Sequence, residues 1–245
     1  MEQIDLARIR AALSSTENTT DLDLAEYERQ QRERLAQLAQ EHEKQNAAFL
    51  TAAALERSGM ARAVQRMTFA NFSVNSALQR ALKHKAEAYV ANHEGRWFFV
   101  GGQSGSGKSH ICTAIVGGLS ARGKRCQYMA WREEYPRFAG LLNTPDYSRE
   151  LNAAKRVEVL YIDDLFKRAG MDNGVPTDGE IKLAYELLNH RALNCLPTII
   201  STEYTQDQLI AIDEATGGRI AEMAKGYAIS ISKDRSKNYR LAGPP

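Results

Sequence analysis

The chain has 245 residues, of which 43% are hydrophobic and 25% are charged, with a formal net charge of +2. This balance gives no general attraction to nucleic acid. With no signal peptide and no apolar run near the roughly 18 residues of a membrane span, we expect a cytoplasmic protein without membrane contact. Cys112, Cys126 and Cys195 are odd in number and lie in predicted core elements, which favours free thiols over disulfides or zinc.

The first 66 residues differ in composition from the rest of the chain. They contain one glycine, no proline and many Ala, Glu, Gln and Arg residues, a composition that predicts helix. The pattern is helical from Leu22 to about Arg57, but the stretch from Glu28 to Gln45 is nearly all polar and cannot pack deeply into a core. Residues 1–66 are therefore either a solvated spacer or a helical arm that docks on a partner protein.

From Met67 onward, helical and strand-like segments alternate in the manner of an α/β fold. We expect one doubly wound α/β domain over residues 67–245, with a parallel sheet flanked by helices and preceded by the helical N-terminal arm. A turn is expected over 143–147, which contains Pro145. Helices are predicted over 75–91, 109–122, 133–142, 176–192, 206–212 and 218–225, and strands over 96–101, 124–131, 157–162, 197–202 and 227–232.

The segment that follows the first strand matches the P-loop pattern G-x-x-x-x-G-K-[ST] at every position. Its glycines allow backbone N–H groups to approach phosphate oxygens, and the next helix presents its positive end to the same anion. Lys108 would reach the β- and γ-phosphates, and the Ser109 hydroxyl would bind Mg²⁺. The candidate ATP-binding residues here are Gly102, Gln103, Ser104, Gly105, Ser106, Gly107, Lys108, Ser109 and His110.

A second metal anchor is predicted where the apolar strand Leu160-Tyr161-Ile162 ends in two carboxylates, Asp163 and Asp164. Asp163 would hold Mg²⁺ together with Ser109. Asp164 lies where many ATPases carry the glutamate that orients the attacking water. Because aspartate is shorter than glutamate, we expect slow hydrolysis.

Several motifs together resemble the bacterial and phage replicative-helicase loaders of the DnaC/DnaI type, which are AAA+ ATPases. They are the P-loop, the 161–164 strand end, Gly218-Arg219-Ile220, and Thr68-Phe69-Ala70-Asn71-Phe72. The resemblance covers roughly residues 67–241, and it implies that the α/β domain over residues 67–245 is a P-loop AAA+ domain. It implies ATP and Mg²⁺ as cofactors. It also implies a hexameric replicative DNA helicase and single-stranded DNA as partners, with self-association through the ATP site.

The resemblance also assigns roles around the nucleotide. Phe69 would lie beside the adenine, although the spacing of Phe69 and Phe72 equally suits a hydrophobic anchor at the domain edge. Thr202 falls at the sensor 1 position, where a hydroxyl would contact the γ-phosphate or the attacking water. Ser201 is the alternative, because a shift of one residue exchanges the two.

Two arginines further along the chain match arginines that act on the nucleotide in this family. Arg219 matches the arginine finger, which would reach a neighbouring subunit's ATP. Many relatives carry a second arginine one turn later, where this chain has Met223. Arg240 resembles the sensor 2 arginine, with Arg235 as the alternative. The basic C-terminal stretch could contact single-stranded DNA or remain solvated; its members are Lys233, Arg235, Lys237, Tyr239 and Arg240.

These expectations describe an ATP-dependent loader that places a replicative helicase on single-stranded DNA, with hydrolysis controlled by assembly. The main alternative is an ATPase helper subunit of a transposase of the IstB type, which shares this domain type. A small-metabolite kinase would need a lid with clustered arginines, and the stretch 167–177 offers only Lys167 and Arg168. A non-hydrolysing ATP-binding scaffold is the remaining possibility.

Overall fold

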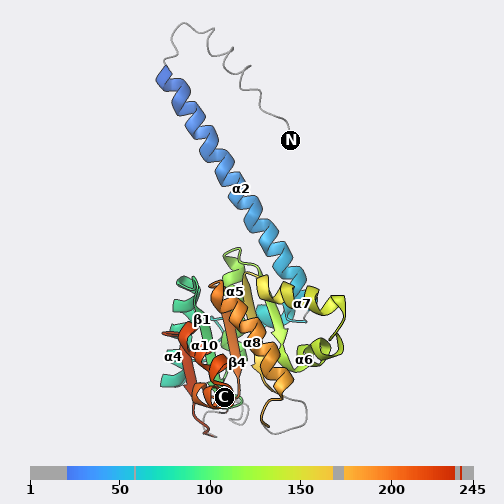
Figure 1. The fold of residues 1–245 in the computed structure, drawn as a ribbon. Coiled ribbons are helices and arrows are strands. Elements are labelled where there is room, and N and C mark those ends of the chain that lie inside the picture. The colour runs from blue at the N-terminus through green and yellow to red at the C-terminus, as the bar shows by residue number, and fades with distance from the viewer. Residues whose placement is uncertain (1–20, 58, 168–173, 235–237, 239–245) are drawn as a thin grey trace. The chain divides into compact units, whose positions relative to one another are not determined.

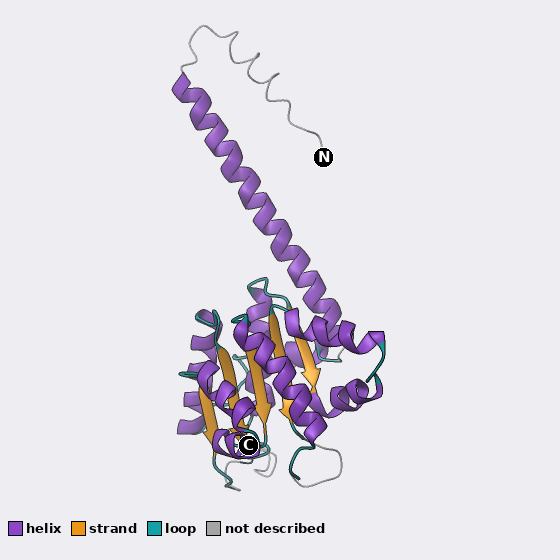
Figure 2. Cartoon of the chain, viewed as in Figure 1, coloured by secondary structure: helices purple, strands orange, loops and turns teal. Residues whose placement is uncertain are grey.

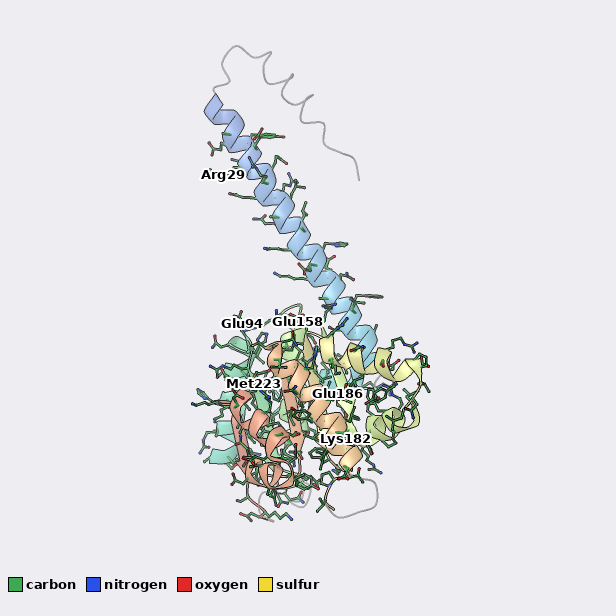
Figure 3. The ribbon with its side chains drawn as sticks, viewed as in Figure 1. Arg29, Glu94, Glu158, Lys182, Glu186 and Met223 are labelled. Carbon is green, nitrogen blue, oxygen red and sulfur yellow. The ribbon has the colours of Figure 1, made fainter. Side chains whose placement is uncertain are left out.

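The computed structural model describes residues 21–57, 59–167, 174–234 and 238, and the chain divides into two compact units, 1–46 and 47–245. The described part of the first unit is helix throughout and belongs to α2, Asp21–Arg57. The side chains of residues 25–46 are exposed or half-buried, as Figure 3 shows for Arg29, so the predicted polar helix is confirmed. Within the described ranges, no helix is both long and apolar enough to cross a bilayer.

The second unit is built on a parallel sheet of five strands in the order β2-β3-β4-β1-β5 (Figure 1). Every strand pair is parallel, as predicted from the apolar runs. Such strands are apolar almost throughout because both faces of the sheet are covered. The strands are β1 Trp97–Gly102, β2 Cys126–Ala130, β3 Val159–Leu165, β4 Thr198–Thr202 and β5 Ala228–Ile231.

Helices cover both faces of the sheet (Figure 2) and enclose two apolar cores. One core includes Tyr161 and Ile199, and the other includes Ile162 and Ile200, as the alternation of strand side chains requires. The first core is covered by α3 Ala61–Arg66, α4 Ala77–Ala91 and α5 Lys108–Ala121. The second is covered by α6 Trp131–Gly140, α7 Pro145–Arg156, α8 Asp178–Leu193, α9 Gln206–Ile212 and α10 Glu214–Met223.

The predicted start of α8 is confirmed in atomic detail. Thr177 accepts a hydrogen bond from the Glu180 backbone N–H at 3.3 Å, and its own N–H donates to Glu180 Oε2 at 2.8 Å. This reciprocal capping box satisfies two N–H groups that have no partner within the helix. It fixes where the helix begins after the stretch 168–173, which lies outside the described residues.

Three sequence predictions differ from the structure. The expected turn over 143–147 is instead the approach to α7, because Pro145 occupies the first helical position, where a missing N–H costs nothing. α10 begins four residues before the predicted Gly218, because Asp213 caps it by accepting from the Thr216 N–H at 2.8 Å. Cys195 is exposed just beyond α8, whereas Cys112 and Cys126 are buried; all three are free thiols.

Residues before the predicted boundary at 66 contribute to the second unit. The Thr51 hydroxyl donates to the Lys124 carbonyl and accepts from the Cys126 N–H, both at 3.1 Å. Leu55 and Met60 are buried in the same core as α5. The compact unit therefore begins near Ala47.

Candidate nucleotide-binding site

The glycine-rich loop joins β1 to α5 at the carboxyl end of the sheet. Gly105 and Gly107 adopt φ angles of 74° and 89°, in the left-handed region that glycine enters without strain. Gly107 caps α5, which begins at Lys108, so the free N–H groups of the first helical turn lie next to the loop. This arrangement can cradle a phosphate group.

Lys108 is the cationic group of this loop. Its side chain is buried, and Nζ donates to the carbonyl oxygens of Gly102 at 2.9 Å and Gln103 at 2.8 Å. Burial lowers the pKa of Lys108, although the nearby Asp164 and Glu203 carboxylates oppose that shift. The ammonium is therefore held at the loop by carbonyl dipoles and by two carboxylates.

The carboxylate of Asp163 faces the same loop, which is the juxtaposition that the nucleotide-site prediction requires. Ser109 Oγ lies 3.3 Å from Asp163 Oδ1, which also accepts from Ser201 Oγ and, at 2.7 Å, from the Tyr161 hydroxyl. Tyr128 donates to the other oxygen, Oδ2, at 3.1 Å. Hydroxyl and carboxylate oxygens suit Mg²⁺, so Ser109 and Asp163 could hold this ion.

Sequence reasoning missed the two tyrosines that hold Asp163. Tyr161 lies two residues earlier on the same strand face, and the parallel register pairs it with Tyr128 on β2. Strand alternation could have identified Tyr161, whereas Tyr128 required knowledge of the strand pairing. Burial, followed by the charge of Asp163, raises the pKa of Tyr128, which keeps its phenol protonated as a donor.

Asp164 occupies an irregular turn at the end of β3. Its φ angle is 54°, and the β3–β4 register shifts between Ile162 and Leu165. Lys167 Nζ lies 2.9 Å from Asp164 Oδ2 and 2.9 Å from Glu203 Oε1. Burial, followed by the neighbouring Asp163, raises the pKa of Asp164, and Lys167 opposes that shift.

At the end of β4, the structure favours Ser201 over the predicted Thr202. The Thr202 hydroxyl is buried and donates to the Leu165 carbonyl at 2.8 Å, away from the aspartates. Ser201 instead hydrogen-bonds Asp163 and accepts from the Asp164 N–H at 3.1 Å. A shift of one residue moves a side chain to the opposite face of a strand, so the alternative, Ser201, is the hydroxyl that lies beside the aspartates.

In the segment 68–72, the aromatic ring beside the P-loop is Phe72 and not Phe69, which was predicted to lie beside the adenine. Phe72 lies against Gly107 and packs edge-on against His110 with ring centroids 5.1 Å apart. Phe69 instead lies against Gly118, about 16 Å further along α5 at 1.5 Å per residue. Phe69 therefore serves as the hydrophobic anchor, and Phe72 is the aromatic ring beside the loop.

The predicted arginines lie apart from this cluster or outside the described residues. Arg219 on α10 donates to Asn189 Oδ1 at 2.8 Å, and its side chain is 32% exposed. Among the described residues, no hydrogen bond joins it to the P-loop or to the aspartates. Arg235 and Arg240 lie outside the described residues, whereas Asn238 is described and its side chain lies against Gly105.

The fold and this cluster define a P-loop domain with a parallel sheet covered by helices on both faces. No family model matches the chain. Among curated proteins, it is 40% identical to the uncharacterized protein YqaM of Bacillus subtilis, over 57% of this chain and 44% of that protein. It is 38% identical to the phage-like element PBSX protein XkdC of Bacillus subtilis, over 58% and 53% respectively. The matches thus span about half the length of these relatives.

Helicase loaders are found both among the similar curated proteins and among the similar solved structures. The chain is 25% identical to the replicative helicase loader DnaC of Escherichia coli, over 68% of this chain and 67% of that protein. The crystal structure of a DnaC helicase loader superposes with a TM-score of 0.59 at 17% identity, covering 71% of this chain and all of that one. The DnaI crystal structure gives 0.56 at 22% identity, covering 70% and 93%. The predicted resemblance to these loaders is confirmed for the fold.

Proposed function

We propose that this chain is an ATP-dependent loader of a replicative DNA helicase onto single-stranded DNA. The observation that carries the proposal is the contact of Ser109 with Asp163, which joins a P-loop to the carboxylates at the end of β3. The likeness to DnaC and DnaI supports the choice among P-loop ATPases. A DnaA initiator bound to AMPPCP and single-stranded DNA has a TM-score of 0.54 at 18% identity, covering 71% of this chain and 52% of that one.

The proposed chemistry follows from the positions of the charged groups. Lys108 would neutralise the β- and γ-phosphates of bound ATP. Ser109 and Asp163 would hold Mg²⁺, which would supply further positive charge beside the phosphates. Asp164 orients the attacking water, and Ser201 ties both aspartates to the end of β4. Phe72, rather than Phe69, is the candidate aromatic contact for the nucleotide.

Control by assembly is the second part of the proposal. Arg219 would act on the nucleotide of a neighbouring copy, which fits its partial exposure and its hydrogen bond to Asn189 on α8 rather than to the loop of its own chain. Residues 1–66 would grip the hexameric helicase. The polar α2 leaves Leu35 and Leu38 exposed at 54% and 56%, and apolar side chains at helical spacing can anchor a partner.

The arm can be tested with the double variant Leu35→Glu, Leu38→Glu in the full chain. Two charges on the apolar positions should weaken co-purification with the replicative helicase by about tenfold or more, which corresponds to roughly 1.4 kcal/mol. The matched control is Gln30→Glu, Gln37→Glu, which adds the same charge at exposed polar positions of the same helix. Capture of a transposase in place of the helicase would favour the transposase-helper alternative.

Arg219→Ala tests the shared site. We expect this variant to bind ATP normally and to lose any rise in turnover per molecule with protein concentration, since only the neighbour's site lacks its cation. Turnover should be measured across a range of protein concentrations, with exposed Arg149→Ala as the control. If turnover of Arg219→Ala still rises with self-association, Arg219 is not the trans-acting group.

A further inference from the structure

Three charged side chains from two strand ends meet beside the P-loop. Asp164 is the second-last residue of β3, Lys167 follows it by three residues, and Glu203 follows β4 directly. Lys167 Nζ lies 2.9 Å from a carboxylate oxygen of each acidic residue. The side chains are only 30%, 29% and 18% exposed, in the order Asp164, Lys167, Glu203, so solvent screens these pairs less than pairs on the open surface.

The turn that carries Asp164 has an unusual backbone. Asp164 and Phe166 have φ angles of 54° and 66°, a region that bulky residues seldom occupy. The Lys167 N–H donates to the Asp164 carbonyl at 2.9 Å, which closes the turn. Such conformations persist where surrounding contacts determine them, so the side-chain bridge from Lys167 is part of what fixes Asp164.

The bridge continues to the phosphate-binding loop. Although burial opposes it, the pKa of Glu203 is lowered by Lys167 and then by two residues of the loop, Lys108 and Ser104. A polar chain thus runs from Asp164 through Lys167 and Glu203 to Ser104. Through this chain, the position of the Asp164 carboxylate depends on the position of the loop that would hold the γ-phosphate.

We propose that Lys167 is a positioning residue that fixes the Asp164 carboxylate relative to the P-loop by pairing it with Glu203. The inference rests on the proposed ATPase function, in which Asp164 orients water. Aspartate lacks one methylene of the glutamate found in many ATPases, so its reach to a water molecule depends on where the backbone and its partners hold it. A misplacement of about 1 Å can cost on the order of 10²-fold in rate.

Direct contact of Lys167 with a phosphate is the competing role. It would require the ammonium to leave both carboxylates, and a partly buried carboxylate without its cation is unfavourable. Lys108 already provides a cation at the loop. The geometry therefore favours positioning over phosphate binding.

Lys167→Met, which keeps the aliphatic length and removes the charge, tests this role in the full chain. We expect kcat for ATP hydrolysis to fall by roughly 10- to 100-fold, with KM and the equilibrium affinity for ATP within about twofold of the wild type. Lys167→Arg should recover part of the rate, because it restores a cation between the carboxylates. Lys182→Met, at an exposed position on α8, is the matched control and should behave as the wild type.

A double-mutant cycle with Asp164→Asn identifies the residue through which Lys167 acts. If Lys167 works by holding Asp164, Lys167→Met should lower the rate no further in that background. An equal fall in both backgrounds, an unchanged kcat, or a raised KM with unchanged kcat would each overturn the positioning role. If the wild-type chain binds ATP but releases no phosphate, the proposed ATPase activity itself is refuted. If the wild type hydrolyses ATP and Lys167→Met does so at the same rate, only the positioning role of Lys167 is refuted.

Discussion

Replacing Lys108 by alanine is expected to lower ATP turnover by roughly 10²–10³-fold or more, the scale seen when one preorganised charge-stabilising group is lost. The ammonium is buried at the loop and bonded to two of its carbonyl oxygens, whereas the nearby cation of Lys167 is already paired with two carboxylates. Phosphate release under saturating ATP and Mg²⁺ measures turnover, and titration with a fluorescent ATP analogue measures affinity.

Lys182→Ala is the control for this variant, since Lys182 is an exposed lysine on α8 (Figure 3). Both variants should keep the wild-type unfolding midpoint to within a few degrees, which separates loss of the phosphate partner from loss of the fold. Turnover and nucleotide affinity of Lys108→Ala equal to those of the wild type would refute the assignment of the loop as a nucleotide site.

The strands and the loop were predictable because their signals are local. A parallel strand buried on both faces is a short apolar run, and segments such as Trp97–Val100 and Thr198–Ile200 have this pattern. Gly102–Ser109 carries its geometry in its own residue types, because glycine adopts the positive φ angles of this loop without strain. The approach of Asp163 to this loop followed from the rule that parallel strands end at the same edge of the sheet.

What the sequence did not predict depends on contacts between distant segments. Pro145 suits a turn or the first turn of a helix, and only the burial of Leu151 and Ala154 in the core selects the helix α7. The choice between Ser201 and Thr202 needed the register of β4 against β3. Glu203 is distant in sequence from Asp164 and Lys167, so the bridge that Lys167 forms between the two carboxylates becomes visible only in the fold.

Arg191 on α8 is the clearest case of a residue that sequence reasoning passed over. An arginine in a helix is ordinarily solvated, yet this one is fully buried, and burial lowers its pKa. Its guanidinium donates to one hydroxyl and to five backbone carbonyls. The acceptors are Thr198 Oγ1 and the carbonyl oxygens of Ala154, Lys155, Val157, Glu158 and Pro197.

Arg191→Met should reduce the free energy of unfolding of the second unit by about 3–5 kcal/mol. The change removes the shared donor of these acceptors, which lie at the end of α7 and at the starts of β3 and β4, and buried carbonyls without a donor are costly. Denaturant unfolding followed by circular dichroism measures the loss as a lower midpoint at an unchanged slope. Arg191→Lys should recover only part, because an ammonium lacks the planar fork that reaches several acceptors at once.

The position of Arg191 also predicts what the variant keeps. Its acceptors lie at the amino ends of β3 and β4, whereas Asp163 lies four residues beyond Val159, about 13 Å along β3 at 3.3 Å per residue. Well below its unfolding midpoint, Arg191→Met should therefore bind ATP with wild-type affinity, while exposed Arg149→Met should change neither stability nor affinity by more than about 0.5 kcal/mol. Full stability in Arg191→Met would show that the buried guanidinium does not hold these strand ends, and a selective loss of ATP affinity would place its effect at the opposite end of the sheet.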